Sequence, residues 1–327
     1  MTDAFDWHGG RLDEARERFG NGNLPWLDLS TGINPRAWPV PEDIDIDWQA
    51  LPTPSALATL EQAAARHFGV DPALCCALPG SEIGLRVLGR LLDLPGRHMA
   101  PCYRTHTAAF RNSHTGDPAR CEGRSDAVVI ANPNNPDGRI LKHAELQRWL
   151  SAQQAAGGWL IVDEAFVDAV PGTSIAGLVG AGRNMIVLRS FGKFFGLAGV
   201  RLGFAIAPPP IVGGLREMLG DWPVSAAAIA IGTRAYADMV WIAKARTDLP
   251  ARERAFDDLL HRHGLVVKGG TCLFRLIENE RAGALFERFG RNKILTRPFA
   301  DYPHWLRLGV PADRNDLARI EAAFTDA

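Results

Sequence analysis

Apolar and polar blocks alternate along the middle of the chain in a rhythm that predicts strands and helices in turn. Residues 127–131, 159–165, 185–189 and 200–207 are short, mostly apolar runs of strand length, as expected for strands covered on both faces. Between the first two runs, residues 143–156 carry apolar side chains at helical spacing. This alternation predicts an α/β domain built on a mostly parallel sheet.

Two helices are predicted on the amino-terminal side of this region. Residues 55–68 place apolar side chains on one face, with Ser55 as the expected N-cap. A second helix is expected to open at Gly80, Ser81 and Glu82, where free backbone amides and a hydroxyl are suited to an anion. For that second helix, an ordinary serine cap is the alternative interpretation.

The carboxy-terminal part has a different pattern. Beyond three consecutive prolines at 208–210, residues 211–263 are predicted to be helical with a break at Trp222-Pro223. A smaller α+β domain is predicted to follow, with strands at 265–268, 272–276, 294–297 and 305–308 and helices at 281–289 and 315–324. We therefore expect an irregular arm (1–35), a large α/β domain (36–210), and a helical connection with a small domain (211–327).

Composition narrows the function classes. The 327 residues carry a net charge of −1, which does not favour nucleic acid or an anionic membrane surface as a partner. The cysteine count of five is odd, and no C-x-x-C or histidine cluster occurs at zinc spacing, so we expect neither a disulfide framework nor a metal site. The polar amino terminus does not resemble a signal peptide. A cytoplasmic protein is the expectation.

Lys193 is the first candidate for chemistry. It stands between Gly192 and Phe194 on an apolar segment, where a buried ammonium is costly unless it is paired or held neutral as a Schiff base. Ser190 and Arg201 are suitable partners for a phosphate near that lysine. A Schiff-base lysine beside phosphate ligands suggests pyridoxal phosphate (PLP), and a glycine-rich loop with a solvent-reaching lysine is the alternative.

The other polar candidates follow predicted strand ends, the side on which open α/β sheets bind ligands. PLP needs an anion site, a carboxylate for its pyridine nitrogen, a donor to the ring oxygen and an aromatic stacking partner. The pyridinium carboxylate would be Asp163, at the end of one run, and the oxygen donor Asn135, in the loop after another. The stacking ring would be Tyr103, after a brief strand at 98–102. The phosphate ligands would be Gly80, Ser81, Glu82, Ser190 and Arg201.

Three motifs carry a family resemblance. They are N-P-x-N-P-x-G at 132–138, V-D-E-A at 162–165 and S-x-x-K-x-x-x-L-A-G-x-R-x-G at 190–203. Together they resemble the class I/II aminotransferase superfamily of fold-type I PLP enzymes, over roughly residues 25 to 325. The resemblance implies Lys193 as the catalytic lysine, PLP as the cofactor and a homodimer.

Within that superfamily, His8-Gly9-Gly10, the segment 28–35 and the lysine segment resemble the threonine-phosphate decarboxylases of cobalamin biosynthesis. The resemblance implies decarboxylation of L-threonine O-3-phosphate to (R)-1-amino-2-propanol O-2-phosphate, with a small phosphorylated amino acid as substrate. It also implies that the substrate's anionic groups are bound by a set of residues far apart in the sequence: His8, Gly9, Asn34, Asn135, Arg297 and Arg307.

Two departures from the superfamily keep alternatives open. Phe166 stands where aminotransferases commonly carry a tyrosine that contacts the PLP ring oxygen, and Leu51-Pro52 replaces a Tyr-Pro segment that reaches the neighbouring subunit. The first alternative is a histidinol-phosphate or other amino-acid aminotransferase. The second is a non-catalytic binding protein with a PLP-enzyme fold.

Overall fold

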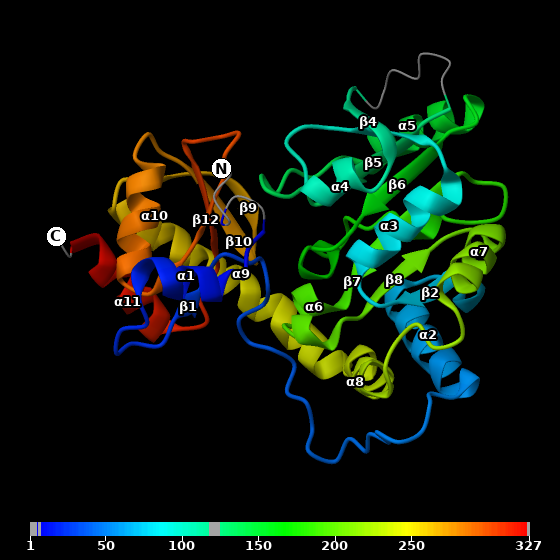
Figure 1. Ribbon diagram of the computed structural model, residues 1–327, viewed down its shortest axis with the longest axis horizontal. Coiled ribbons are helices and arrows are strands. Elements are labelled where there is room, and N and C mark those ends of the chain that lie inside the picture. Colours follow the sequence, from blue (N-terminus) through cyan, green and yellow to red (C-terminus); the bar gives the residue numbers. More distant parts are fainter. Residues whose placement is uncertain (1–4, 6–7, 118–124, 326–327) are drawn as a thin grey trace. The chain divides into compact units, whose positions relative to one another are not determined.

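The computed structural model describes residue 5, residues 8–117 and residues 125–325 (Figure 1). Its internal contacts divide the chain into two compact units. Unit 1 comprises Met1–Arg36, Pro136–Arg139 and Lys244–Ala327, and unit 2 comprises Ala37–Asn135 and Ile140–Ala243. Residues 211–243, which the sequence pattern groups with the small domain, thus belong to the same unit as the large sheet.

Unit 2 is built on a seven-stranded sheet with the order β2-β8-β7-β6-β5-β3-β4. Neighbours from β7 to β4 run parallel, whereas β8 is antiparallel to both β7 and β2. The predicted α/β class with a mostly parallel sheet is confirmed. The strands are β2 (Cys75–Leu78), β3 (Pro95–His98), β4 (Arg111–Thr115), β5 (Ala127–Ala131), β6 (Trp159–Asp163), β7 (Met185–Ser190) and β8 (Gly203–Ile206).

Both faces of this sheet are covered. Ala127 and Val129 of β5 belong to one apolar core, which also contains Leu85 of α3 and Leu215 of α7. Val128 points to the opposite face, because side chains alternate along a strand, and it is fully buried as well. The helices of unit 2 are α2 (Pro54–Phe68), α3 (Ser81–Leu92), α4 (Arg104–Ala108), α5 (His143–Ala155), α6 (Phe191–Phe194), α7 (Pro209–Leu219) and α8 (Ala226–Ala237).

Three local predictions for unit 2 are wrong. The N-cap of α2 is Thr53, whose Oγ1 accepts from the Ala56 amide at 3.2 Å, because Pro54 is already set for the first helical position and starts the helix earlier than Ser55. The strand expected at 98–102 ends at His98, just before a segment whose Pro101 has no amide to donate. The strand expected at 200–207 begins only at Gly203, because Arg201 adopts a left-handed conformation with φ 55°.

Unit 1 contains a four-stranded antiparallel sheet with the order β12-β13-β10-β9 and a separate parallel pair, β1 with β11. The single strand expected at 294–297 is therefore two short strands in different sheets. Asp313 caps the last helix, α11 (Arg314–Thr325), by accepting from the Asn315 and Asp316 amides at 2.9 and 3.2 Å. The strands are β1 (Leu27–Asp28), β9 (Val266–Thr271), β10 (Phe274–Glu278), β11 (Ile294–Leu295), β12 (Arg297–Pro298) and β13 (Trp305–Gly309).

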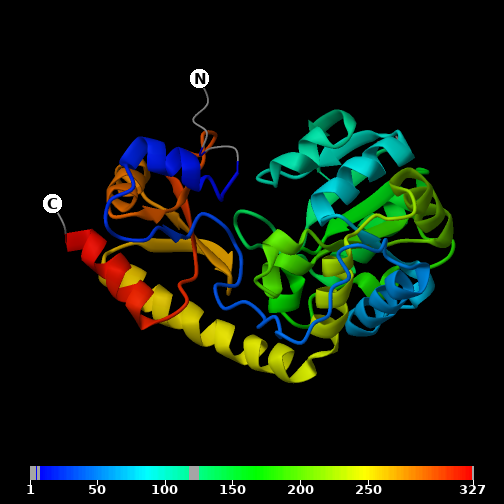
Figure 2. The same ribbon diagram turned by 60° about the horizontal axis from the view of Figure 1, so that its bottom comes forward.

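The helices of unit 1 pack on an apolar core that includes Phe256, Phe286, Phe289 and Ile320. They are α1 (Leu12–Phe19), α10 (Ala282–Arg291), α11 (Arg314–Thr325) and most of α9 (Met239–Arg262). Helix α9 begins in unit 2 and continues unbroken through Pro250, as the yellow helix in Figure 2 shows. Among the described helices, none has the length and apolar character that crossing a bilayer requires.

Candidate functional site

The carboxyl ends of β5, β6 and β7 bring the central motifs together. Ala131 at the end of β5 pairs with Asp163 at the end of β6, which in turn pairs with Leu188 of β7. The amide of Asn132 donates to the Asp163 carbonyl at 2.9 Å. The asparagine-rich loop therefore starts directly beside the predicted pyridinium carboxylate, and the buried Asn135 lies at its end.

The reversed direction of β8 adds the phosphate candidates to the same edge. Gly203, the first residue of β8, pairs with Ser190 at the end of β7 and with Leu78 at the end of β2. Residues that precede β8 and residues that follow β2 must therefore meet at this edge. Arg201 is the nearest charged residue before β8, and Ser81 opens α3 after β2.

Gly80 and Arg201 form a close pair at this point. Gly80 has φ 96°, a conformation that residues with a Cβ rarely adopt, and a Cβ there would lie 2.9 Å from Nη2 of Arg201. The Arg201 guanidinium is held by a 3.2 Å hydrogen bond from Nη1 to the Ala198 carbonyl. Since the first amides of a helix have no intrahelical partner, α3 adds donors beside this cation. The group is a cradle for an anion.

Glu82 contributes to this cradle only through its backbone. Its carboxylate accepts from Arg86 Nη2 at 3.1 Å and from the Thr105 hydroxyl at 3.3 Å. An anion would be repelled by that carboxylate but attracted by the amide at the second position of α3.

Asp163 is paired with a residue that the sequence prediction missed. Its Oδ2 lies 3.0 Å from Nε2 of His106, which is fully buried on α4, and its Oδ1 accepts from the Ala165 amide at 3.1 Å. Burial by itself lowers the pKa of His106, but the hydrogen bond and charge of Asp163, with a further contribution from Cys102, raise that pKa to about 9. A protonated imidazole therefore faces the Asp163 carboxylate at neutral pH.

The position of His106 relative to Tyr103 is the signal that could have identified it. Three residues apart at the start of α4, the two rings meet edge to face, with centroids 5.7 Å apart and an interplanar angle of 88°. The predicted stacking residue and the partner of Asp163 are thus placed by one helical turn.

Lys193 lies on the four-residue helix α6 and is half-buried. The helix is fixed by the fully buried rings of Phe191, Phe194 and Phe195. Nζ of Lys193 lies over the ring of Phe166, 5.7 Å from its centroid. An aromatic face attracts a cation, so the phenylalanine that replaces the superfamily's tyrosine still contacts the candidate catalytic amine.

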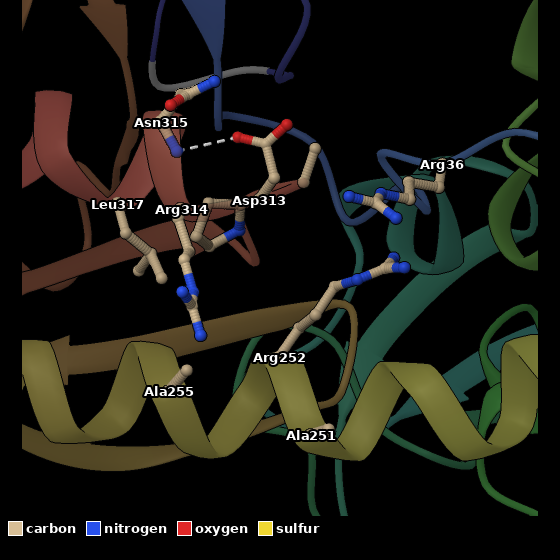
Figure 3. Close-up of a pocket in the computed structure, with 10 residues that line it drawn as sticks. Arg36, Ala251, Arg252, Ala255, Asp313, Arg314, Asn315 and Leu317 are labelled. Carbon is tan, nitrogen blue, oxygen red and sulfur yellow. Dashed lines mark hydrogen bonds between the residues drawn. The ribbon is translucent and has the colours of Figure 1, made fainter.

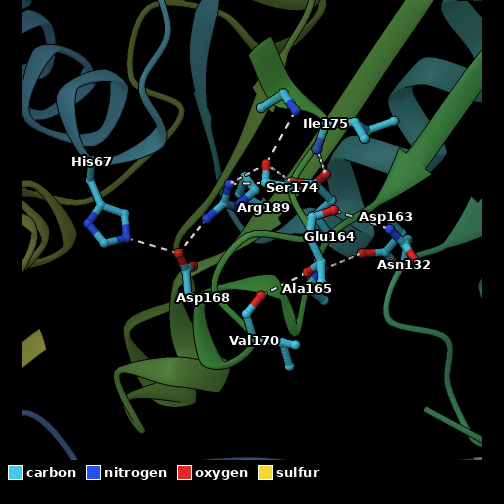
Figure 4. A network of polar contacts seen from close by, with 12 residues as sticks. His67, Asn132, Asp163, Glu164, Ala165, Asp168, Val170, Ser174, Ile175 and Arg189 are labelled. Carbon is cyan, nitrogen blue, oxygen red and sulfur yellow. Dashed lines mark hydrogen bonds and ion pairs between the residues drawn. The ribbon is translucent and has the colours of Figure 1, made fainter. Parts of the chain in front are cut away.

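The second carboxylate of the V-D-E-A motif, Glu164, is held in a network of hydrogen bonds and ion pairs (Figure 4). Glu164 is fully buried, accepts from the Ser174 hydroxyl and the Ile175 amide, each at 2.7 Å, and pairs with Arg189 at 3.4 Å. Burial raises the pKa of Glu164, and the charge of Arg189 opposes that rise. Arg189 also pairs with Asp168, which His67 Nε2 contacts at 2.9 Å. This network holds the loop that carries Phe166.

The two predicted substrate arginines lie in unit 1, directly opposite each other. Arg297 of β12 and Arg307 of β13 are register partners in an antiparallel pair, which places their Cβ atoms about 5 Å apart. Both are buried, with 5% and 3% exposure. Their guanidinium carbons lie 4.9 and 5.0 Å from the ring centroids of Phe299 and Phe274. Two buried cations side by side favour a bound anion.

Ser30 links the amino-terminal arm to this pair. Arg307 Nη2 donates to the Ser30 carbonyl at 2.8 Å, and the Gly10 amide donates to the Ser30 hydroxyl at 2.7 Å. A Cβ on Gly9 would lie 2.4 Å from the Ser30 carbonyl oxygen, so only glycine allows this approach. The half-buried His8 precedes it. The sequence analysis did not single out Ser30. Its place within the segment 28–35, which carries the family resemblance, could have suggested it.

The other predicted residues are placed as follows. Asn34 is buried in unit 1, and its Oδ1 accepts from the Arg36 amide at 3.0 Å. Asn135 is the one predicted substrate residue that belongs to unit 2, together with all the predicted cofactor residues. In the described ranges, no group of three or more histidine, cysteine, aspartate or glutamate residues is arranged to hold a metal ion.

The donor set in unit 2 fits PLP. The Gly80–Arg201 cradle and the first amides of α3 suit its phosphate, Asp163 suits its protonated nitrogen, and Lys193 supplies the amine. His106, by donating to Asp163, supports a negative charge at that position.

Comparisons with known proteins agree with this geometry. The family model described as "Aminotransferase class I and II" matches residues 107–323. The chain is 40% identical to a threonine-phosphate decarboxylase of Pseudomonas aeruginosa, over 97% of this chain and 96% of the relative. It is 31% identical to a histidinol-phosphate aminotransferase of Rhodospirillum centenum, over 79% of each. The crystal structure of the histidinol-phosphate aminotransferase from Clostridium acetobutylicum shares the fold, with a TM-score of 0.81, 17% identity, and coverage of 92% of this chain and 100% of that one.

The chain therefore belongs to the aminotransferase class I and II family.

Proposed function

We propose that this chain is a PLP-dependent carboxy-lyase that converts L-threonine O-3-phosphate to (R)-1-amino-2-propanol O-2-phosphate and CO2, a step of cobalamin biosynthesis. The observation that carries the proposal is the 40% identity to a threonine-phosphate decarboxylase over 97% of this chain and 96% of the relative. An alignment of that extent includes most of the amino-terminal arm as well as both arginines.

The charges of unit 1 support a substrate with two anionic groups. L-Threonine O-3-phosphate carries a carboxylate and a phosphate, and Arg297 and Arg307 offer two fork-shaped cations side by side. Gly9, adjacent to His8, and Arg307 both contact Ser30, so the arm lies beside the second arginine. The buried amide of Asn34 belongs to the same unit. These residues would orient the substrate so that its Cα–carboxylate bond, and not Cα–H, is broken.

The residues of unit 2 would hold the cofactor and move one proton. When bound, PLP accepts the electron pair left on Cα as the bond to the carboxylate breaks. Asp163, supported by His106, keeps a negative charge at the pyridine nitrogen. Lys193, over the Phe166 ring, donates a proton from Nζ to Cα after CO2 has left. The roles of Asn135 and Tyr103, toward the ring oxygen and the ring face, belong to the same proposal.

The decisive experiment is incubation of the PLP-loaded protein with L-threonine O-3-phosphate in the absence of any keto acid. Release of CO2 equal to the aminopropanol phosphate formed supports the proposal, and the Lys193→Ala protein is the matched control. The alternative, an aminotransferase, is favoured by the 31% identity to a histidinol-phosphate aminotransferase. It predicts turnover only when 2-oxoglutarate is added. A protein that shows no new visible absorption after PLP addition would instead indicate a non-catalytic binding function.

The proposal includes a homodimer in the cytoplasm, as the sequence resemblance and the cysteine usage suggest. Unit 2 exposes Trp48 and Leu51 to 77% and 62%. The hollow of about 500 Å³ beside them is lined by Leu51, by Ile46 and by residues of α2 and α8. Large exposed apolar side chains around a hollow are typical of interaction surfaces. Light scattering should give twice the chain mass, and Leu51→Asp should shift the protein towards the monomer.

A further inference from the structure

A second cationic site lies in unit 1, and neither Arg297 nor Arg307 lines it. Between α9, the start of α11 and the segment that ends at Arg36 there is a hollow of about 500 Å³ (Figure 3). Arg252 rises from α9 towards Arg36, with the two guanidinium groups facing each other, and Arg314 extends from the start of α11 towards α9. Three arginines from three separate segments therefore line one hollow, with Arg252 and Arg36 facing each other and Arg314 directed to another part of α9.

These three cations are poorly compensated. Within the described part of the chain, the guanidinium groups of Arg36 and Arg314 make no hydrogen bond or ion pair. The Arg252 side chain, only 16% exposed, has its ion-pair partner Asp248 at 3.6 Å, and Asp248 also receives a hydrogen bond from Lys244 at 3.0 Å. Burial and the neighbouring charge of Arg36 lower the pKa of Arg252, and the charges of Asp248 and Asp313 oppose that fall.

The one acidic residue in the lining, Asp313, offsets only part of the charge of the three arginines. Asp313 accepts hydrogen bonds from the Asn315 and Asp316 amides as the cap of α11. This cap also occupies amides of the helix terminus, so α11 has fewer backbone donors for a ligand. Recognition in this hollow must therefore come from the guanidinium groups.

We propose that this hollow binds a compact polyanion with at least two phosphate groups, of which inorganic pyrophosphate is the simplest example. Guanidinium forks match phosphate oxygens with paired hydrogen bonds, and three of them exceed what a single phosphate needs. The remaining wall is made of small or apolar residues, Ala251, Ala255, Pro311 and Leu317, which leave room for an organic group attached to the phosphates. The site is separate from the proposed reaction and does not depend on it.

Calorimetric titration of the PLP-loaded protein tests the proposal, with inorganic pyrophosphate, ADP and sulfate at equal ionic strength. Pyrophosphate is expected to bind at least tenfold more tightly than sulfate, and Arg252→Gln to weaken that binding at least tenfold. Arg36→Gln is expected to have a smaller effect, because that residue is more exposed. Arg254→Gln is the matched control: it removes an exposed arginine of α9 that does not line the hollow, and should change binding less than twofold.

Arg297 and Arg307 also attract phosphates. The binding event that belongs to the hollow is therefore the one that Arg252→Gln weakens and Arg297→Gln leaves unchanged. Tighter binding of ADP than of pyrophosphate would identify a nucleotide as the ligand class, and equal binding would identify the phosphates alone. Equal binding by wild type and Arg252→Gln, or no preference for pyrophosphate over sulfate, would overturn the proposal. Decarboxylation by Arg252→Gln is expected to match wild type, so failure here is distinguishable from failure of the proposed function.

Discussion

The buried charges of the two units are arranged in opposite ways. In unit 2, Asp163 faces His106, and Glu164 and Asp168 share Arg189. In unit 1, Arg297 lies directly opposite Arg307, cation beside cation. In unit 2 these buried charges are paired with opposite charges, which preorganises them, whereas in unit 1 two like charges stand side by side, an arrangement that attracts an anion. In the proposed function, this difference separates the residues that hold the cofactor from those that select the substrate.

The largest effect should come from removing the amine of unit 2. Lys193→Ala is expected to reduce decarboxylation by at least about 10⁴-fold, because covalent attachment and proton return both depend on Nζ. Lys193→Arg, which keeps a cation above Phe166 without a nucleophilic amine, should be equally inactive. CO2 release measures both. Retained decarboxylation in Lys193→Ala would refute the assignment of the catalytic lysine.

Breaking the arginine pair should affect the substrate and spare the fold. Arg297→Gln and Arg307→Gln are each expected to lower kcat/KM for L-threonine O-3-phosphate by about 30- to 1000-fold, the usual cost of losing one partner of a buried charged contact. Without substrate, the melting temperature should fall only slightly, because relief of the like-charge repulsion offsets part of the lost contacts, such as the hydrogen bond from Arg307 to Ser30. An unchanged PLP absorption spectrum would show that these substitutions leave the cofactor residues of unit 2 intact. A large fall in melting temperature would mean that the arginines are structural.

The balanced pair of unit 2 should make stability depend on pH. The pKa of His106 is raised from 6.5 to about 9, so its stabilising charge is fully present below pH 6.5 and is lost as pH rises through 9. The loss is about 3 kcal/mol between these limits. Chemical denaturation of the protein before PLP addition, at pH 6 to 10, measures it. His106→Gln should flatten this dependence, and an unchanged slope would show that another group titrates.

The smallest effect is expected at Phe166. A cation–π contact contributes about 0.5–1 kcal/mol at a partly exposed site. Phe166→Leu should therefore accelerate PLP attachment to Lys193 at neutral pH by about two- to fivefold, because the neutral amine becomes more populated. Phe166→Tyr keeps the ring and should behave like wild type. Stopped-flow absorbance measures the rate, and equal acceleration in both variants would exclude the ring as the cause.

Sequence patterns within individual segments predicted much of the fold. They also supplied the candidate cofactor residues of unit 2, apart from His106. The apolar runs at 127–131, 159–165 and 185–189 became β5, β6 and β7 with small changes in bounds. The reversed direction of β8 could not be predicted, because its apolar run resembles those of the parallel strands beside it. Only the antiparallel β8 explains why Arg201, which precedes its strand, lies at the same edge as Ser190, which ends one.

Contacts between segments far apart in the sequence could not be predicted either. His106 was missed because its spacing of three residues from Tyr103 places it on the same helical turn but does not reveal its contact with Asp163, 57 positions later. The edge strands β2 and β4 were also missed, the latter because Arg111–Thr115 is mostly polar and exposed. The opposition of Arg297 and Arg307 depends on the register of two strands, which their sequence separation does not encode.

The most direct test of the account follows the hydrogen on Cα of the substrate. L-Threonine O-3-phosphate with deuterium on Cα, incubated with the PLP-loaded protein in ordinary water, should release CO2 and retain the deuterium on the carbon that lost the carboxylate. That result would mean that the Cα–carboxylate bond breaks, as the proposed anchoring by unit 1 predicts. Deuterium lost to water without CO2 release would mean that the Cα–H bond breaks instead, and would contradict the account.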